Sequence, residues 1–179
     1  MKILVVGSGG REDATVLKLA ESPEVEEIIC APGSHAIGLR RIISNGRPVR
    51  VISGIQPTDA KIMADYAKEA RMDLVVPGHE SCLEADLGDW CRAYGIPFAG
   101  PCSRGARLET SKAFQFQFLM DNGIPSPLGK ICETVTSAKA FANMHWNGVV
   151  VKADGMARGK GVKLCENTEE AYAAIEKLM

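Results

Sequence analysis

The first hundred residues alternate between short apolar runs and longer amphipathic segments. Runs rich in β-branched residues predict buried strands at residues 2–6, 25–33, 49–53 and 73–78, with a last short strand at 96–101. The segments between them have helical spacing of apolar residues and predict helices at residues 10–22, 57–70 and 82–94. Because strands and helices alternate, the pattern predicts an α/β fold with a doubly wound parallel sheet.

The pattern changes after residue 101. Residues 103–122 predict one helix or two, followed by Gly123 as a C-cap and a proline-containing linker. The remaining residues predict an α+β unit, with strands at 128–132, 148–153 and 162–165 and helices at 137–145 and from Asn167 or Thr168 onward. We therefore expect a first domain at 1–101, a helical linker at 102–124 and a small second domain at 125–179.

The composition fits a packed globular protein. Hydrophobic residues make up 46% of the chain and charged residues 24%, which favours a folded core over disorder. The net charge of −1 gives no basic field for nucleic acid or for an anionic membrane, and no apolar run approaches the roughly 20 residues that span a bilayer. The chain opens directly on a predicted strand without a charged leader, so a cytoplasmic location is expected.

The six cysteines form no CxxC pair, and the three histidines lie far apart along the sequence. Buried, reduced thiols that pack as small hydrophobic side chains explain them better than a zinc site or a disulfide framework. No metal site is expected from these residues.

A glycine-rich loop, "VVGSGGRE", stands where the first strand meets the first helix, a place where backbone amides bind anions. A nicotinamide-binding loop needs a third glycine, and Glu12 occupies that position. The second strand also ends without the acid that binds a ribose hydroxyl. Gly7, Gly9 and Gly10, followed by Arg11 and Glu12, instead suit a single phosphate group and polar ligand atoms, although a plain tight turn has the same appearance.

A second glycine-rich stretch, "VVVKADGMARGKGV", covers residues 149–162. Lys152 ends a predicted buried strand, where an ammonium group is costly without an anion. Three glycines permit close backbone approach and two further cations add charge, in a loop formed by Gly155, Arg158, Gly159, Lys160 and Gly161. No GK[ST] opens a helix, so the loop is not a Walker A motif; we expect a polyphosphate lid, with Lys112 as a second cation.

The motifs "GSGGRE", "APG", "DLVVPGHE", "GPCSRGARLETSKAF", "NGIPSP" and "VVVKADGMARGKGV" occur in an order that resembles the phosphoribosylamine–glycine ligase family of the ATP-grasp superfamily. The resemblance covers nearly the whole chain. It implies a Rossmann-like parallel sheet as a pre-ATP-grasp domain, followed by a small α+β first half of an ATP-grasp unit. It also implies a reaction that joins glycine to 5-phosphoribosylamine in de novo purine biosynthesis, with ATP cleaved to ADP and phosphate through a glycyl phosphate.

The resemblance also implies roles for individual residues. Those facing phosphoribosylamine are Gly9, Gly10, Arg11, Glu12 and Glu80. Those binding ATP are the two lysines and the lid, namely Lys112, Lys152, Asp154, Gly155, Arg158, Gly159, Lys160 and Gly161. The implied cofactors are ATP and Mg²⁺, and the magnesium ligands are expected outside this chain.

Three departures from the family pattern bear on this interpretation. Asp13 stands where the family has histidine, and His79 stands where it has proline. The sequence also ends at Met179, before the second half of an ATP-grasp unit, so we expect either a missing C-terminal half or a separate partner chain. A non-catalytic module that binds a phosphorylated metabolite and another ATP-grasp carboxylate–amine ligase remain alternatives; a nicotinamide oxidoreductase ranks behind them.

Overall fold

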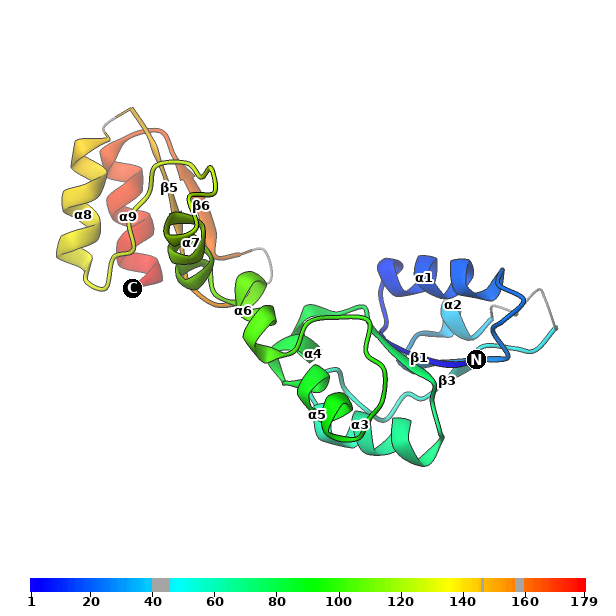
Figure 1. The fold of residues 1–179 in the computed structure, drawn as a ribbon. Helices are drawn as coiled ribbons and strands as arrows, with labels where there is room; N and C mark the ends of the chain where they lie inside the picture. Colours follow the sequence, from blue (N-terminus) through cyan, green and yellow to red (C-terminus); the bar gives the residue numbers. More distant parts are fainter. Residues whose placement is uncertain (40–45, 146, 157–159) are drawn as a thin grey trace. The chain divides into compact units, whose positions relative to one another are not determined.

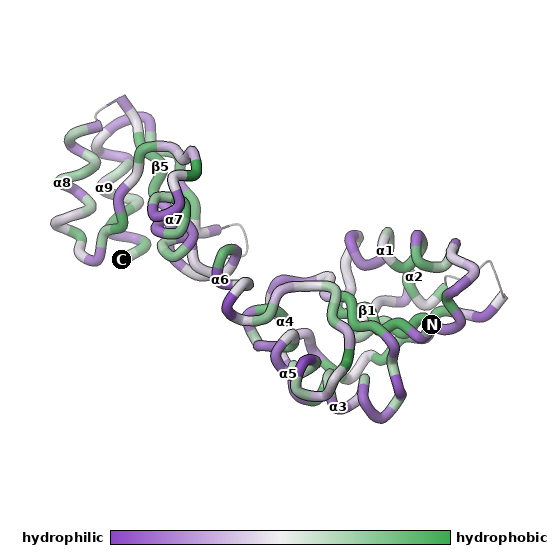
Figure 2. Tube along the Cα trace, viewed as in Figure 1, coloured by the Kyte–Doolittle hydropathy of each residue, from purple (hydrophilic) through white to green (hydrophobic). Residues whose placement is uncertain are grey.

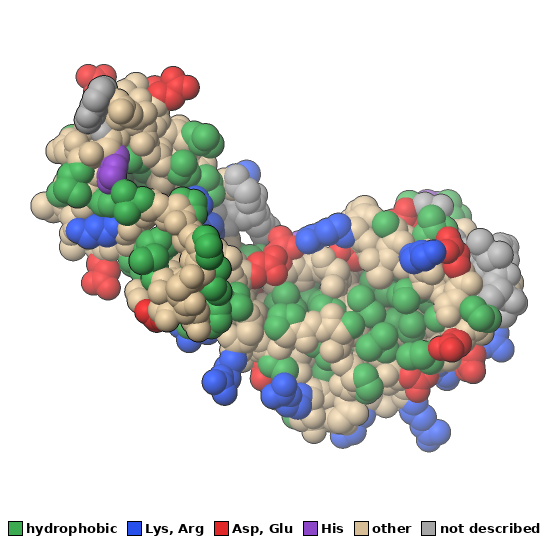
Figure 3. All heavy atoms as spheres, turned by 45° about the horizontal axis from the view of Figure 1, so that its top comes forward, with side chains coloured by type: hydrophobic (Ala, Val, Ile, Leu, Met, Phe, Trp, Pro, Cys, Tyr) green, Lys and Arg blue, Asp and Glu red, His purple; other side chains and the backbone are tan. Residues whose placement is uncertain are grey.

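A computed structural model describes the chain except for residues 40–45, 146 and 157–159. The chain forms two compact units, Met1–Ala106 and Arg107–Met179 (Figure 1). Figure 3 shows acidic and basic side chains interspersed over the face that it presents. Within the described ranges, no helix is both long enough and apolar enough to cross a membrane.

The first unit is built on a parallel sheet in which the order of the strands is β3-β2-β1-β4. These strands are β1 (Lys2–Gly7), β2 (Glu27–Pro32), β3 (Arg50–Val51) and β4 (Leu74–Pro77). A parallel bridge between Val75 and Phe98 continues the pairing beyond β4, at the last short strand predicted from the sequence. Because the chain winds outward from β1 in both directions, the sheet is doubly wound, as the alternating pattern predicts.

Helices cover both faces of this sheet. Their bounds are α1 (Gly10–Ala20), α2 (His35–Gly38), α3 (Ala60–Glu69), α4 (Glu80–Glu84) and α5 (Leu87–Ala93). Successive residues of a strand point to opposite faces, so Ile3 and Val5 pack with Val16 of α1, whereas Leu4 and Val6 pack with the helices of the other face. Figure 2 shows β1 as a hydrophobic stretch of the trace.

The second unit contains a two-stranded antiparallel hairpin of β5 (Val149–Lys152) and β6 (Val162–Cys165). Its helices are α7 (Lys112–Asp121), α8 (Val135–Met144) and α9 (Thr168–Leu178), while α6 (Ser103–Thr110) precedes them. One face of the hairpin, with Val149, Val151 and Cys165, packs against Ala142 of α8 and Ile175 of α9. On the other face Val150 and Leu164 are 50% and 80% exposed, opposite each other in the register.

The predicted fold class is confirmed, and two predicted elements are wrong. The single helix predicted at 82–94 is two helices, because Asp86 adopts a left-handed conformation with φ of 63° between α4 and α5. Residues 128–132 form no strand: Leu128 is 81% exposed, and this segment belongs to neither of the two sheets among the described residues. Residues 103–122, where the sequence predicts one helix or two, form two helices, α6 and α7, on either side of Ser111.

Candidate functional site

The turns that follow β1 and β4 lie side by side at the carboxyl edge of the sheet. Val6 of β1 is in register with Pro77 of β4, and β2 pairs with the opposite side of β1. The chain therefore winds in opposite directions from this point, and doubly wound sheets bind ligands at such a switch point. Residues 9–12 and 78–80, which the sequence singles out separately, meet here.

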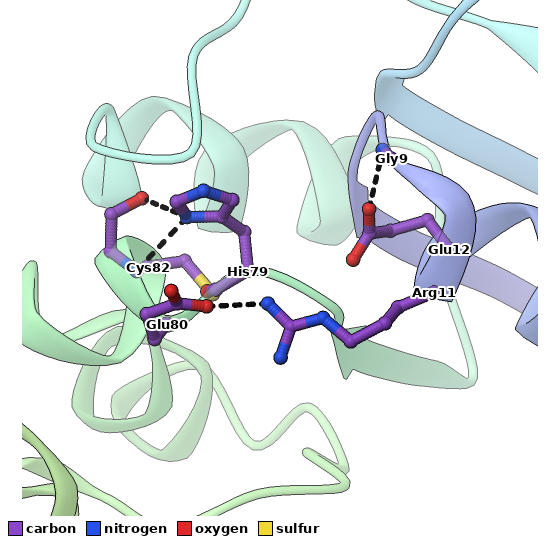
Figure 4. A network of polar contacts seen from close by, with 7 residues as sticks. Gly9, Arg11, Glu12, His79, Glu80 and Cys82 are labelled. Atoms are coloured by element: carbon purple, nitrogen blue, oxygen red, sulfur yellow. Dashed lines mark hydrogen bonds and ion pairs between the residues drawn. The ribbon is translucent and has the colours of Figure 1, made fainter. Parts of the chain in front are cut away.

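An ion pair joins the two turns. Arg11 Nη2 lies 2.5 Å from Glu80 Oε2, and the two side chains point toward one another from α1 and α4 (Figure 4). The pKa of the Glu80 carboxyl is held below its ordinary value, first by a hydrogen bond from its own backbone and then by Arg11. A cation and an ionised carboxylate at the mouth of a switch point can bind the phosphate and hydroxyl groups of a sugar phosphate.

Glu12 fills the space between the same two turns. Its side chain is 2% exposed, and Oε2 accepts a hydrogen bond of 2.5 Å from the backbone of Gly9, whereas Oε1 has no partner among the described residues. A Cβ at Gly78 would lie 2.3 Å from Glu12 Oε1, and one at Gly7 would lie 2.6 Å from Glu12 Cδ. Both glycines therefore leave room for the carboxyl group, which packs inward rather than over the surface of the loop.

His79 is the N-cap of α4, a role that sequence reasoning missed. Its Nδ1 accepts a hydrogen bond of 3.2 Å from the backbone of Ser81 and lies 2.7 Å from Ser81 Oγ (Figure 4). Its own backbone N–H donates to the carbonyl of Val6 at the end of β1. Because Ser81 N–H is a donor, Nδ1 acts as an acceptor and the ring proton sits on Nε2. Histidine is not among the preferred N-cap residues, so the sequence carries little signal for this contact.

The second candidate site joins two motifs that lie about forty residues apart. Lys112 Nζ donates a hydrogen bond of 2.7 Å to the carbonyl of Gly155. The carboxylate of Asp154 accepts from the hydroxyl of Ser111 at 3.1 Å and from the backbone of Ala113 at 3.2 Å. Burial raises the pKa of Asp154, but these hydrogen bonds and those of neighbouring amides outweigh it and lower the pKa overall. The "SK" motif thus contacts the start of the glycine-rich loop directly.

Lys152 is the last residue of β5 and is exposed on the open face of the hairpin. One step further, the backbone of Ala153 donates a hydrogen bond of 2.7 Å to the carbonyl of Gly161, which closes the base of the loop. Lys160 is exposed beside it. Arg158 and Gly159 lie outside the described residues.

The described ranges contain no group of three or more His, Cys, Asp or Glu side chains that could hold a metal ion. All six cysteines are free thiols, and burial raises the pKa of Cys30 and Cys82 to about 12. Cys102 and Cys132 are partly exposed, so the prediction of buried thiols is wrong for these two.

Two family models together cover the whole chain. The model of the phosphoribosylglycinamide synthetase N domain matches residues 1–109, and that of the phosphoribosylglycinamide synthetase ATP-grasp (A) domain matches residues 110–179. The chain belongs to the phosphoribosylglycinamide synthetase family. Both candidate sites therefore lie in domains of this family, the first in the N domain and the second in the ATP-grasp (A) domain.

Relatives from this synthetase family match 98% or more of the chain. The phosphoribosylamine–glycine ligase of Phenylobacterium zucineum is 39% identical over 176 residues, which are 98% of this chain and 40% of the relative. The enzyme of the same name from Escherichia coli K12 is 37% identical over 179 residues, again 40% of its length. The chain thus spans about 40% of the curated relatives that it matches.

Solved structures show the same fold. The phosphoribosylamine–glycine ligase of Thermotoga maritima matches with a TM-score of 0.70 at 23% identity. The match covers 97% of the present chain and 38% of the solved chain. The biotin carboxylase domain of 2-oxoglutarate carboxylase from Hydrogenobacter thermophilus, solved with MgADP, ADP and bicarbonate, has a TM-score of 0.75 at 22% identity. It covers 99% of this chain, which spans 40% of the solved chain.

Proposed function

We propose that this chain is the N-terminal part of an ATP-dependent ligase that joins glycine to 5-phosphoribosylamine, with formation of ADP and phosphate, in de novo purine biosynthesis. The observation that carries the proposal is the direct contact between the "SK" motif and the glycine-rich loop, within a segment that matches the family's ATP-grasp domain. Independent support comes from the first unit, where Arg11 and Glu80, which are predicted to bind phosphoribosylamine, form an ion pair at the switch point of the sheet.

In the first unit, the proposed binding site for phosphoribosylamine consists of Gly9, Gly10, Arg11, Glu12 and Glu80. The amides at the start of α1 favour a phosphate group, because the N-terminus of a helix carries partial positive charge. Arg11 adds a full charge at the same turn. Glu80 suits a ribose hydroxyl or the substrate amine, since an ionised carboxylate only accepts hydrogen bonds. Glu12 shapes the turn from inside.

In the second unit, the proposed ATP site consists of the two lysines and the lid, namely Lys112, Lys152, Asp154, Gly155, Arg158, Gly159, Lys160 and Gly161. Cations beside the transferring phosphoryl group stabilise the charge that spreads over its oxygens. A lid closed over the site keeps water from an acyl phosphate, which water would hydrolyse. Lys152 and Lys160 are both exposed, so neither ammonium group is buried in the core of the second unit.

Magnesium, when bound, supplies further charge neutralisation on the phosphates. The described residues contain no group of three or more His, Cys, Asp or Glu side chains that could hold it. We therefore propose that the magnesium ligands come from a C-terminal half or a partner chain, and that the assembled enzyme works in the cytoplasm.

The proposal is tested by assaying the complete protein for glycine-dependent release of ADP in the presence of phosphoribosylamine and MgATP. Glycine should become attached to phosphoribosylamine, and formate or bicarbonate should not replace glycine. Turnover with formate or bicarbonate would identify another ATP-grasp ligase. Binding of phosphoribosylamine without any ATP cleavage would identify a non-catalytic module.

A further inference from the structure

The first turn of α7 receives a cap from a residue far along the chain. A helix begins with backbone N–H groups that have no partner within the helix. Ser111 is the N-cap residue, and its hydroxyl oxygen accepts from the backbone of Phe114 at 3.1 Å. Asp154 Oδ1 accepts from the backbone of Ala113, and the single proton of the Ser111 hydroxyl is directed at both oxygens of the same carboxylate. Asp154 thus completes the cap.

A second contact of opposite polarity lies next to this cap. Lys112 Nζ donates to the carbonyl of Gly155, the residue that follows Asp154. Two consecutive loop residues therefore bind three consecutive residues at the start of α7. One contact places a carboxylate on a helix N-terminus, and the other places an ammonium group on a loop carbonyl. The two contacts together fix the beginning of the glycine-rich loop against α7. They follow directly after Ala153, whose backbone hydrogen bond to Gly161 closes the base of the loop.

We infer that Asp154 is a positioning residue: it anchors the start of the lid to the N-terminus of α7 and so holds Lys112 beside the strand end that carries Lys152, without itself contacting the nucleotide. This inference rests on the proposed ATP site, and it gives Asp154 a supporting place in that site in place of a nucleotide contact. An aspartate beside a polyphosphate is repelled by it, whereas one at a helix N-terminus is attracted by the helix dipole. The low pKa of Asp154 agrees with a carboxylate that is ionised in this cap.

The anchor is tested first without nucleotide, by amide hydrogen exchange. In Asp154→Ala the Ala113 amide loses its acceptor, so its exchange should accelerate about tenfold, the usual worth of such a hydrogen bond. Asp154→Asn keeps one acceptor oxygen and should give a smaller increase. The amide of Ala153, which is bonded within the hairpin, should be unaffected. The matched control is Asp121→Ala at the other end of α7, where the carboxylate bonds Gln117 and not the first turn. Unchanged exchange at Ala113 in Asp154→Ala would overturn the inference.

The functional consequence is tested in the complete protein by steady-state kinetics. Asp154→Ala should raise the KM for MgATP about fivefold or more, with Asp154→Asn in between, because two mispositioned cations lose charge-assisted contacts. The Mg²⁺ concentration for half-maximal activity at saturating ATP should stay as in the wild type. An equal rise in this Mg²⁺ requirement in both variants would make Asp154 a metal ligand and contradict the inference. If the wild-type protein shows no ATP-dependent ligation, the proposed function fails while the exchange experiment still decides the anchor.

Discussion

Glu12 has a structural role in the fold in addition to its proposed place in the phosphoribosylamine site. Its carboxyl group is buried between the turns after β1 and β4, in space that two glycines leave open. The sequence shows that glutamate replaces the third glycine of a dinucleotide-binding loop. It does not show that Gly78, which lies 66 positions later, makes room for it. The arrangement depends on the pairing of β1 with β4 and becomes visible only in three dimensions.

The space around Glu12 gives a prediction at Gly78. Gly78→Ala should lower the free energy of unfolding by about 1–3 kcal/mol, because the added Cβ overlaps the Glu12 side chain and the backbone or the carboxyl group must shift. Urea denaturation measures the loss. Gly10→Ala is the matched control, since a Cβ there meets no atom within 4 Å. An equal effect at both positions would contradict the role assigned to Glu12.

The ion pair between Arg11 and Glu80 gives a prediction about pH. The pKa of Glu80 is lowered in the folded state, so its stabilising contribution is present above the ordinary carboxyl pKa and is lost as the pH falls through the lowered value. Arg11→Met should raise the pKa of Glu80 only part of the way, because the backbone hydrogen bond, the larger cause, remains. Carbon-13 NMR titration of the side-chain carboxyl measures this shift. Arg50→Met, which breaks a pair with Glu27 on the other side of β1, should leave Glu80 unchanged.

At the scale of elements, local signals predict most of the helices and strands but not where a helix breaks or which segments meet. Asp86 breaks a segment with good helical periodicity, although aspartate carries a weaker signal for a left-handed conformation than glycine. Residues 128–132 have a strand-like composition but join neither sheet among the described residues, and a strand requires a partner strand. The contact of Lys112 with Gly155 likewise links two segments whose proximity no local pattern encodes.

The N-cap of α4 gives a prediction at this scale. His79→Ala should lower the free energy of unfolding by about 1 kcal/mol, the usual cost of losing an N-cap acceptor. His79→Asn should retain most of the stability, because asparagine is a preferred cap. Urea denaturation of the two variants distinguishes them. If the alanine variant is as stable as the asparagine variant, the contact of His79 with Ser81 does not hold the helix.

At the scale of the whole molecule, the two units have separate cores. Those of the first unit lie on the two faces of the parallel sheet, and that of the second is a smaller cluster around Cys165, Ala171 and Ile175. Ile28→Ala should lower the unfolding free energy of the first unit by about 2–5 kcal/mol and leave the second unit unchanged, and Ile175→Ala should do the reverse. Residue-resolved amide exchange reports the two units separately. If either substitution lowered the unfolding free energy equally in both units, the units would fold as one.

The central claim is that the second unit binds polyphosphate through its lysines and glycine-rich loop, and the most direct test is the affinity of the complete protein for MgATP in a matched pair of variants. Lys152 and Lys163 lie on neighbouring strands of one hairpin but on opposite faces, because Lys152 is in register with Val162. Lys152→Ala should weaken MgATP binding about tenfold or more, since it removes a charge-assisted phosphate contact. Lys163→Ala should bind as the wild type does. Equal affinity in both variants, indistinguishable from the wild type, would contradict the proposed site.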